Sequence, residues 1–225
     1  MIKQIIQQVV EGSPCQFQKL DTLLEELTFY KAAHLSYQRF LVILETDKLS
    51  TPSELNEFIQ GNTPQSLLET PTFAKNTDLV ILFRLDSLTK LHQYEHKIFD
   101  IEENAYSLKK HVLYYTEAES EKLKQYLDLG ESIETLVTEL EYFNHYKQEP
   151  FKESAFSLAC RLYIKFPFLA VPATKATLTN ANQLADKFLS EQQLSDFYNT
   201  IEVQLAVGNE HYKIMEELIN EQMAD

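Results

Sequence analysis

Apolar residues in the first part of the chain change their spacing near residue 36. Before it, they recur every three or four positions in two segments, Ile2 to Val10 and Phe17 to Leu27, with Gly12-Ser13-Pro14 between them. Residues at this spacing share one face of a helix, so the pattern predicts two amphipathic helices. After it, Phe40 to Leu44 is an unbroken apolar run, which is typical of a strand buried on both faces.

Two more apolar runs, Leu79 to Phe83 and Val112 to Tyr115, predict two further buried strands, the first of them extending to Leu85. Helical patterns separate the three strands, one from Pro52 to Gly61 and one from Ser87 to Ile101. Strands that alternate with helices in this way favour parallel pairing, because the crossover helix packs back onto the sheet. We therefore expect a small, mostly parallel sheet flanked by helices over residues 36–116.

Beyond Thr116 the apolar periodicity is helical. The pattern predicts helices at residues 117–127, 133–146, 151–165, 181–189, 194–207 and 212–219. The expected fold class is mixed α/β followed by an all-helical C-terminal part. We divide the chain into residues 1–130, which hold the N-terminal helices and the α/β layer, and residues 131–225, the helical region.

The composition is that of a globular protein with a strong excess of acidic residues. The 225 residues are 44% hydrophobic and 24% charged, and 34 Asp and Glu against 20 Lys and Arg give a net charge of -14. A chain of this length buries roughly 70% of its unfolded surface. Its negative field repels the phosphate backbone of nucleic acids, so we do not expect stand-alone DNA binding.

The sequence predicts neither export nor a membrane anchor. The first residues lack the continuous apolar stretch and the cleavage site of a secretory signal, and no apolar run is long enough to span a bilayer. The two cysteines, Cys15 and Cys160, are interpreted as reduced, buried thiols. We expect a cytoplasmic protein.

Several catalytic classes find no support in the residues. A phosphate-binding loop needs closely spaced glycines, and the four glycines stand apart, at positions 12, 61, 130 and 208. Any ATP hydrolysis would therefore belong to a partner. Asp78, Asp86 and the Asp47-Lys48 pair lack the spacing of a metal-dependent nuclease, and strand-end carboxylates commonly cap turns. We predict no enzyme activity and no cofactor.

One string, His92-Gln93-Tyr94-Glu95-His96, matches the H-x-x-E-H motif of inverted zinc proteases. On a helix, two histidines one turn apart bind zinc, and the glutamate acts as general base. A third protein ligand is needed, and the sequence nominates none. A motif this short also arises by chance, in which case the residues lie on a solvated helix face, the interpretation we prefer.

Three groups of residues are candidates for contacts with a protein partner. A terminal amphipathic helix can insert into a groove, and an aromatic helix face can form an interface. Paired lysines can contact an acidic partner surface or DNA that the partner holds. The residues are Ile2, Ile5, Ile6, Val9, Lys109, Lys110, Tyr142, Phe143 and Tyr146. Each group has an alternative: the apolar and aromatic side chains pack in the core, and the lysines neutralise Glu102 and Glu103.

The segment from Thr77 to Thr116 holds a buried strand, an amphipathic helix, the acidic turn Ile101-Glu102-Glu103-Asn104, the Lys109-Lys110 pair and an aromatic strand. This order resembles the middle component of bacterial ABC-three-component systems. That family includes the small accessory subunit of Lamassu-type defence complexes against phages and plasmids. The resemblance is clearest over residues 36–116.

The resemblance implies a non-catalytic adaptor in a hetero-oligomer. Its partners would be an SMC-like coiled-coil ATPase and an effector, often a nuclease, and it would meet DNA only through the ATPase. Two other functions stay open. A zinc peptidase would hold stoichiometric zinc that is lost on His92→Ala or His96→Ala. A stand-alone regulatory or toxin-like module would act without neighbouring genes.

Overall fold

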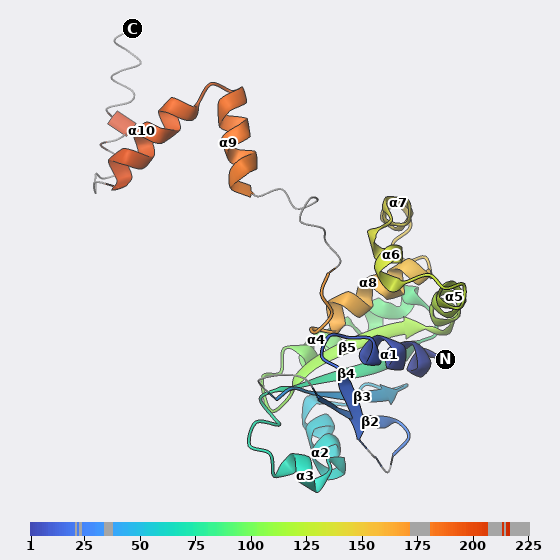
Figure 1. Ribbon diagram of the computed structural model, residues 1–225. Coiled ribbons are helices and arrows are strands. Elements are labelled where there is room, and N and C mark those ends of the chain that lie inside the picture. Colours follow the sequence, from blue (N-terminus) through green and yellow to red (C-terminus); the bar gives the residue numbers. More distant parts are fainter. Residues whose placement is uncertain are drawn as a thin grey trace. The chain divides into compact units, whose positions relative to one another are not determined.

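The computed structural model describes residues 1–20, 22, 24–33, 38–171, 181–206, 213, 215 and 216. The chain forms two compact units, residues 1–172 and 173–225 (Figure 1). The expected fold class is confirmed, with a mixed α/β sheet, flanking helices and a helical C-terminal region. The helix expected at 212–219 lies outside the described residues, apart from positions 213, 215 and 216.

The first unit is built on a five-stranded sheet whose spatial order follows the sequence. The strands are β1 (Phe17–Leu20), β2 (Leu27–Ala32), β3 (Phe40–Thr46), β4 (Thr77–Leu85) and β5 (Lys109–Thr116). β3, β4 and β5 run parallel, as the alternation of strands and helices predicts. β1 and β2 extend the sheet beyond β3 and are antiparallel to their neighbours. The sheet therefore has a parallel half and an antiparallel half.

The prediction of a second N-terminal helix over Phe17 to Leu27 is wrong, because this segment forms β1 and the start of β2. The apolar residues that suggested the helix belong to β1, to the connection that contains Leu24 and to β2. In β2, Phe29 packs on one face of the sheet and Tyr30 on the other. Pairing with β3 and burial on both faces outweigh a helical spacing that rested on only four residues.

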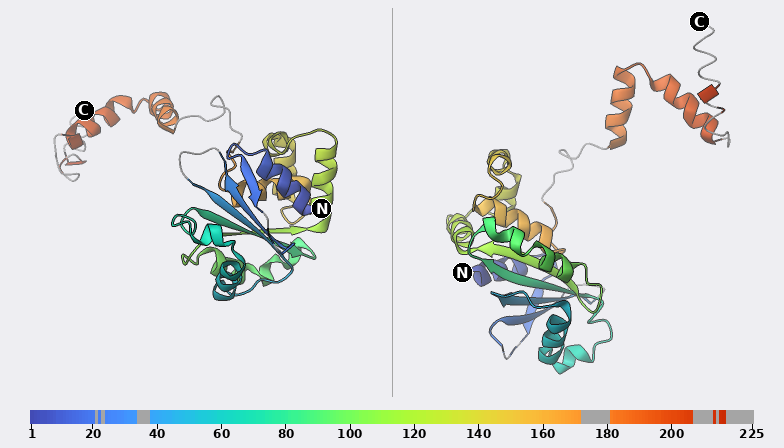
Figure 2. Two further views of the ribbon diagram at one scale, coloured as in Figure 1. Left: turned by 60° about the horizontal axis from the view of Figure 1, so that its bottom comes forward. Right: turned by 180° about the vertical axis from the view of Figure 1, so that it is seen from behind.

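Helices cover both faces of the sheet (Figures 1 and 2). One face packs against α1 (Ile2–Glu11), α5 (Glu117–Asp128), α6 (Ile133–Thr138) and α8 (Ala155–Lys165). The other packs against α2 (Pro52–Asn62), α3 (Gln65–Leu68), the 3-10 helix η1 (Leu88–Gln93) and α4 (Glu95–Glu102). Successive strand residues point to opposite faces, so Val42 and Ile43 lie in different cores. This double coverage explains the unbroken apolar runs.

Two segments that are predicted as single helices each form two. Residues 87–101 divide at Tyr94 into η1 and α4, and residues 133–146 divide at Glu139 into α6 and α7 (Leu140–Gln148). Glu139 has an extended backbone, with φ -74° and ψ 116°. The Thr138 hydroxyl donates to the Glu134 carbonyl at 2.9 Å, which satisfies an acceptor in the last turn of α6.

A buried ion pair between Glu119 of α5 and Arg161 of α8 fastens both helices to β5. The guanidinium also donates to the Tyr114 carbonyl of β5 and, at 3.2 Å, to the Ser157 carbonyl. The Cζ atom of Arg161 lies 4.6 Å from the ring centroid of Tyr114. Burial raises the pKa of Glu119, and the Arg161 charge acts against this rise. Because both charges are removed from water, each charge needs the other to offset the free-energy cost of its burial.

Side chains from both helical layers close the outer edge of β5. Glu102, at the end of α4, accepts a hydrogen bond from the Val112 amide at 2.6 Å and pairs with Lys165, at the end of α8, at 2.6 Å. An open edge strand offers its amides to other chains, so this bridge protects β5 from further strand pairing. Glu102 therefore pairs with Lys165 rather than with Lys109 or Lys110, contrary to the alternative considered from the sequence.

The described part of the second unit is a pair of short helices, α9 (Ala181–Glu191) and α10 (Ser195–Ala206), together with the isolated positions 213, 215 and 216. Both agree with the predicted helices to within two residues. In the turn between them, Gln193 has a left-handed backbone (φ 58°), and the Leu194 amide donates to the Leu189 carbonyl at 2.8 Å. This turn closes α9 and begins α10 within a few residues. Across the residues that the structure describes, no helix is both long and apolar enough to cross a membrane.

Replacing Arg161 with Met should destabilise the first unit strongly, because Glu119 is then buried without a counter-charge. We expect the free energy of unfolding at pH 7 to fall by about 3–5 kcal/mol, measured by urea denaturation. The loss should shrink as the pH falls. A buried carboxyl whose pKa is raised binds a proton more tightly in the folded state than in the unfolded state, so acid favours folding.

Arg84→Met is the matched control. Arg84 also pairs with a carboxylate, that of Asp47 at 3.0 Å, but both side chains are largely exposed. The loss should therefore stay below about 1 kcal/mol. Equal losses for the two variants would contradict the importance of burial for the Glu119–Arg161 pair.

Candidate partner interface

Helix α7 (Leu140–Gln148) and Phe151, three residues beyond its end, present large apolar side chains to solvent. None of the nine residues of α7, all of them described, is buried. Leu140 is 68% exposed, Phe143 43% and Phe151 62%. In Figure 1, α7 lies farther from the sheet than α6 and α8. We define the α7 surface as the exposed residues Leu140, Tyr142, Phe143, Tyr146 and Phe151.

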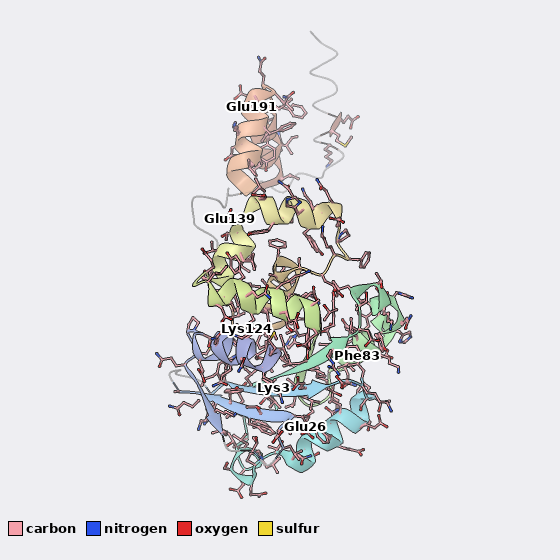
Figure 3. All side chains as sticks on the ribbon, turned by 90° about the vertical axis from the view of Figure 1, so that its right-hand side faces the viewer. Lys3, Glu26, Phe83, Lys124, Glu139 and Glu191 are labelled. Carbon is pink, nitrogen blue, oxygen red and sulfur yellow. The ribbon has the colours of Figure 1, made fainter. Side chains whose placement is uncertain are left out.

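The break at Glu139, which is labelled in Figure 3, explains this exposure. In a continuous helix, the apolar residues from Ile133 to Phe143 would form one buried stripe. In the structure, Ile133 and Leu136 before the break are buried in the core, whereas Leu140 and Phe143 after it are exposed. Because the backbone is extended at Glu139, the apolar side chains that follow it are exposed on the surface and do not continue the buried stripe.

Aromatic contacts hold α7 on the first unit. The ring centroids of Tyr142 and Tyr146, one helical turn apart, lie 6.4 Å and 5.9 Å from that of Phe156 on α8. Phe156 itself is buried in the core. Aromatic pairs of this kind contribute about 0.5–1.5 kcal/mol each beyond the area they bury. The helix is thus held in a defined position although its outer side chains are exposed.

Charged side chains of both signs border the α7 surface. The Nζ atom of Lys147 lies 4.8 Å from the ring centroid of Phe143, a cation–π contact. Glu149 pairs with Lys152 at 2.6 Å, and the hydrogen bond from Lys152 lowers the pKa of the Glu149 carboxyl. Glu141 lies in the first turn of the helix. An aromatic centre within a charged rim is typical of protein–protein interfaces.

The N-terminal apolar stripe lies inside the first unit. Ile2, Ile5 and Ile6 are buried on α1, and Val9 packs partly buried against the same core. Lys3, on the same helix, pairs with a carboxylate at the end of β3 at 2.7 Å. These apolar side chains therefore have a packing role within the chain, and their contact with a partner stays a prediction.

The two adjacent lysines have different environments. Lys109 is exposed, whereas Lys110 is 3% exposed. The Lys110 ammonium donates to the carbonyls of Asn104, Tyr106 and Leu108, the closest at 2.6 Å, and burial lowers its pKa. Lys110 therefore holds the loop between α4 and β5 and does not present its charge to an acidic partner. For Lys109, such a contact stays a prediction.

The histidines of the H-x-x-E-H string do not share one helix, so the prediction of a single helix here is wrong. His92 lies in η1, whereas Glu95 and His96 begin α4, and all three are exposed. The Nδ1 atoms lie 2.8 Å from the Thr89 carbonyl for His92 and 3.0 Å from the Asp100 carboxylate for His96. Within the described residues, no three His, Cys, Asp or Glu side chains are grouped to hold a metal ion.

A cluster of polar side chains that the sequence did not indicate joins the starts of the three parallel strands, with Asp78 buried and its two neighbours partly buried. Asp78 of β4 lies 3.0 Å from Arg39, which precedes β3, and 3.6 Å from Nε2 of His111 on β5. Burial acts to raise the pKa of Asp78, but the neighbouring His111 and Arg39 outweigh it, and the pKa is lowered. Because the cluster spans the three strands, we assign it a role in holding their register.

Sequence reasoning missed Leu140 and Phe151 as surface residues. Leu140 fits the period of a buried helix, and neither proline nor glycine marks the break before it. For Phe151 a signal existed. The Ser154 hydroxyl caps α8 by accepting the Ser157 amide at 3.1 Å, so the helix begins at Ala155 and not at Phe151. Serine is a preferred N-cap residue, and this would have left Phe151 outside the helix.

Comparison with known proteins gives one family match. Residues 39–141 match the family model described as ABC-three component (ABC-3C) system Middle Component 1. The match runs from just before β3 into the first turn of α7 and covers less than half of the chain. It agrees with the resemblance seen over residues 36–116, and it does not distinguish Lamassu-type systems. Neither curated proteins nor solved structures give a match.

Lys110→Met should destabilise the first unit, whereas Lys109→Met should not. Removing the buried ammonium leaves loop carbonyls without their charged donor, which should lower the free energy of unfolding by about 2–4 kcal/mol. The neighbouring exposed lysine should change it by less than about 0.5 kcal/mol. Chemical denaturation of the two variants measures both effects. A small effect at both positions would show that the loop does not depend on Lys110.

Proposed function

We propose that this chain is the middle component of an ABC-three-component system and acts as a non-catalytic adaptor between an SMC-like ATPase and an effector. The family match over residues 39–141 supports membership. The α7 surface supports an adaptor and is the observation that carries the proposal. In this role the chain contacts only other proteins. ATP hydrolysis and DNA contact belong to the ATPase, and cleavage belongs to the effector.

The α7 surface has the properties of a site that another protein covers. Its five large apolar side chains are exposed within the short segment from Leu140 to Phe151. Clustered apolar surface is unfavourable in water, and water-soluble chains keep it mainly where a partner binds. The contacts with Phe156 already order the helix, so binding costs less conformational entropy than the folding of a loose segment would.

The position of the α7 surface relative to the matched segment also supports this role. The match ends at residue 141, so it contains the parallel half of the sheet, α5 and α6, and only the start of α7. Most of the α7 surface therefore lies just beyond the part that the family model describes. On our proposal, the shared core positions the helix, and the helix selects the partner.

The charge of the chain suits partners that handle DNA. Proteins that bind nucleic acids carry basic surfaces, and a chain with a net charge of -14 is complementary to them. The finer assignment, to a Lamassu-type complex that acts against phages or plasmids, rests on the resemblance of the segment from Thr77 to Thr116. The Lamassu assignment is part of the same proposal.

The double variant Leu140→Glu, Phe143→Glu should release at least one partner. The tagged full chain is expressed from its own operon, and the co-purifying proteins are quantified by mass spectrometry. Two charges in the centre of an apolar interface should lower the recovery of that partner by about tenfold or more. Both side chains are exposed in this chain, so its thermal stability should be unchanged.

Phe99→Glu is the matched control. Phe99 is an aromatic residue on α4 with 61% exposure, and the same substitution there should leave both partners bound. Wild-type recovery of both components by the double variant would overturn the role of the α7 surface. A wild-type chain that purifies without an ATPase and an effector would overturn the adaptor function itself.

A further inference from the structure

The second unit exposes apolar residues that the proposed role of α7 does not explain. On α9, Leu184 is 53% and Phe188 59% exposed, and Phe197 and Val203 on α10 are exposed as well. From residue 184 to residue 205, all of which the structure describes, no side chain is buried. The two helices therefore do not bury these apolar side chains between themselves.

Most of these side chains recur at helical intervals. Leu184 and Phe188 are one turn apart on α9, and Phe197, Ile201 and Leu205 follow one another every four residues on α10. An amphipathic helix presents its anchors to a groove at such intervals. We define the hairpin stripe as Leu184, Phe188, Phe197, Ile201 and Leu205.

Helices of this length need a surface to pack on. α9 has 11 residues and α10 has 12, and isolated helices shorter than about 12–15 residues are marginally stable in water. In proteins, most helical stability comes from burying the apolar face. Since the hairpin stripe is not buried between α9 and α10, these helices gain stability by packing against another surface.

The charges beside the hairpin stripe indicate the chemistry of that surface. The two helices carry four carboxylates against one ammonium: Asp186, Glu191, Asp196, Glu202 and Lys187. The ammonium lies 3.8 Å from the Glu191 carboxylate and is thus already paired. A second copy of this chain would bring acidic faces together and would be repelled. A surface rich in lysine and arginine is complementary to these helices.

We infer that the α9–α10 hairpin is a second docking element, which places the hairpin stripe in an apolar groove bordered by lysine and arginine on another protein component. This inference rests on the proposed function, because it takes the other protein to be the ATPase or the effector. It gives the chain one binding surface on each unit, the minimum that an adaptor between two proteins requires.

Hydrogen exchange of the full chain tests the inference. The amides of residues 184–205 are measured in the isolated chain, and again with the purified ATPase component or the purified effector component. Exchange should be fast in the isolated chain at every concentration of the chain. One of the two components should slow it by about tenfold or more, because a covered helix opens less often.

The component that slows exchange should bind the variant Phe188→Ser, Phe197→Ser about thirtyfold more weakly than the wild type, as expected for the loss of two aromatic anchors. Ser190→Ala, Asn199→Ala is the matched control on the polar sides of the helices and should bind like the wild type. The variant Asp186→Lys, Asp196→Lys should also bind more weakly. Its affinity should depend less on salt than that of the wild type, because it has fewer charges that attract a basic rim.

Three results would overturn the inference while leaving the proposed function intact. Slow exchange in the isolated chain at low concentration would show that the chain covers its own stripe. Slow exchange only at high concentration would show a second copy as the occupant. A complex that forms without slower exchange at residues 184–205 would exclude the hairpin from the interface. If neither component binds the wild-type chain, the proposed function fails, and this inference fails with it.

Discussion

Burial of the three parallel strands on both faces is the constraint on which the rest of the first unit depends. The crossovers between these strands place α2, α3 and α4 on one face, so α1, α5, α6 and α8 must cover the other. The Glu119–Arg161 pair then fixes α8 against α5 and β5. This places Phe156 where Tyr142 and Tyr146 contact its ring. The core thus holds α7 in place, although α7 itself contributes no buried residue to that core.

The arrangement separates stability from recognition. The charged groups with the strongest structural roles, Glu119, Arg161 and Lys110, are buried and engaged within the chain. The apolar residues that we assign to partner binding lie outside the core, on and just beyond α7 in the first unit and on α9 and α10 in the second. An adaptor needs such a division, because its binding surfaces can change without loss of the fold that presents them.

The sequence predicted the parts of the fold that are buried most completely. Runs such as Leu79 to Phe83 are apolar at every position because both faces of the sheet are covered, so the three parallel strands could be recognised. β1 is short and has only one buried residue, and the apolar residues from Phe17 to Leu27 also fit a helix. The break at Glu139 carries no proline or glycine. Because the sequence does not reveal this break, only the aromatic character of Tyr142, Phe143 and Tyr146 supported their prediction as partner-binding residues. The contrast between Lys109 and Lys110 depends on which face each strand residue points to, and this is fixed only by the tertiary structure.

Site-specific photo-cross-linking in the assembled complex tests the central claim most directly. A photoreactive amino acid replaces Phe143 on α7 or, as the reference position, Phe99 on α4, and the cross-linked products are identified by mass spectrometry. The adaptor account predicts that position 143 cross-links to the ATPase or to the effector, whereas position 99 gives no intermolecular product. A complex that assembles normally and gives no cross-link to another component from position 143 would contradict it.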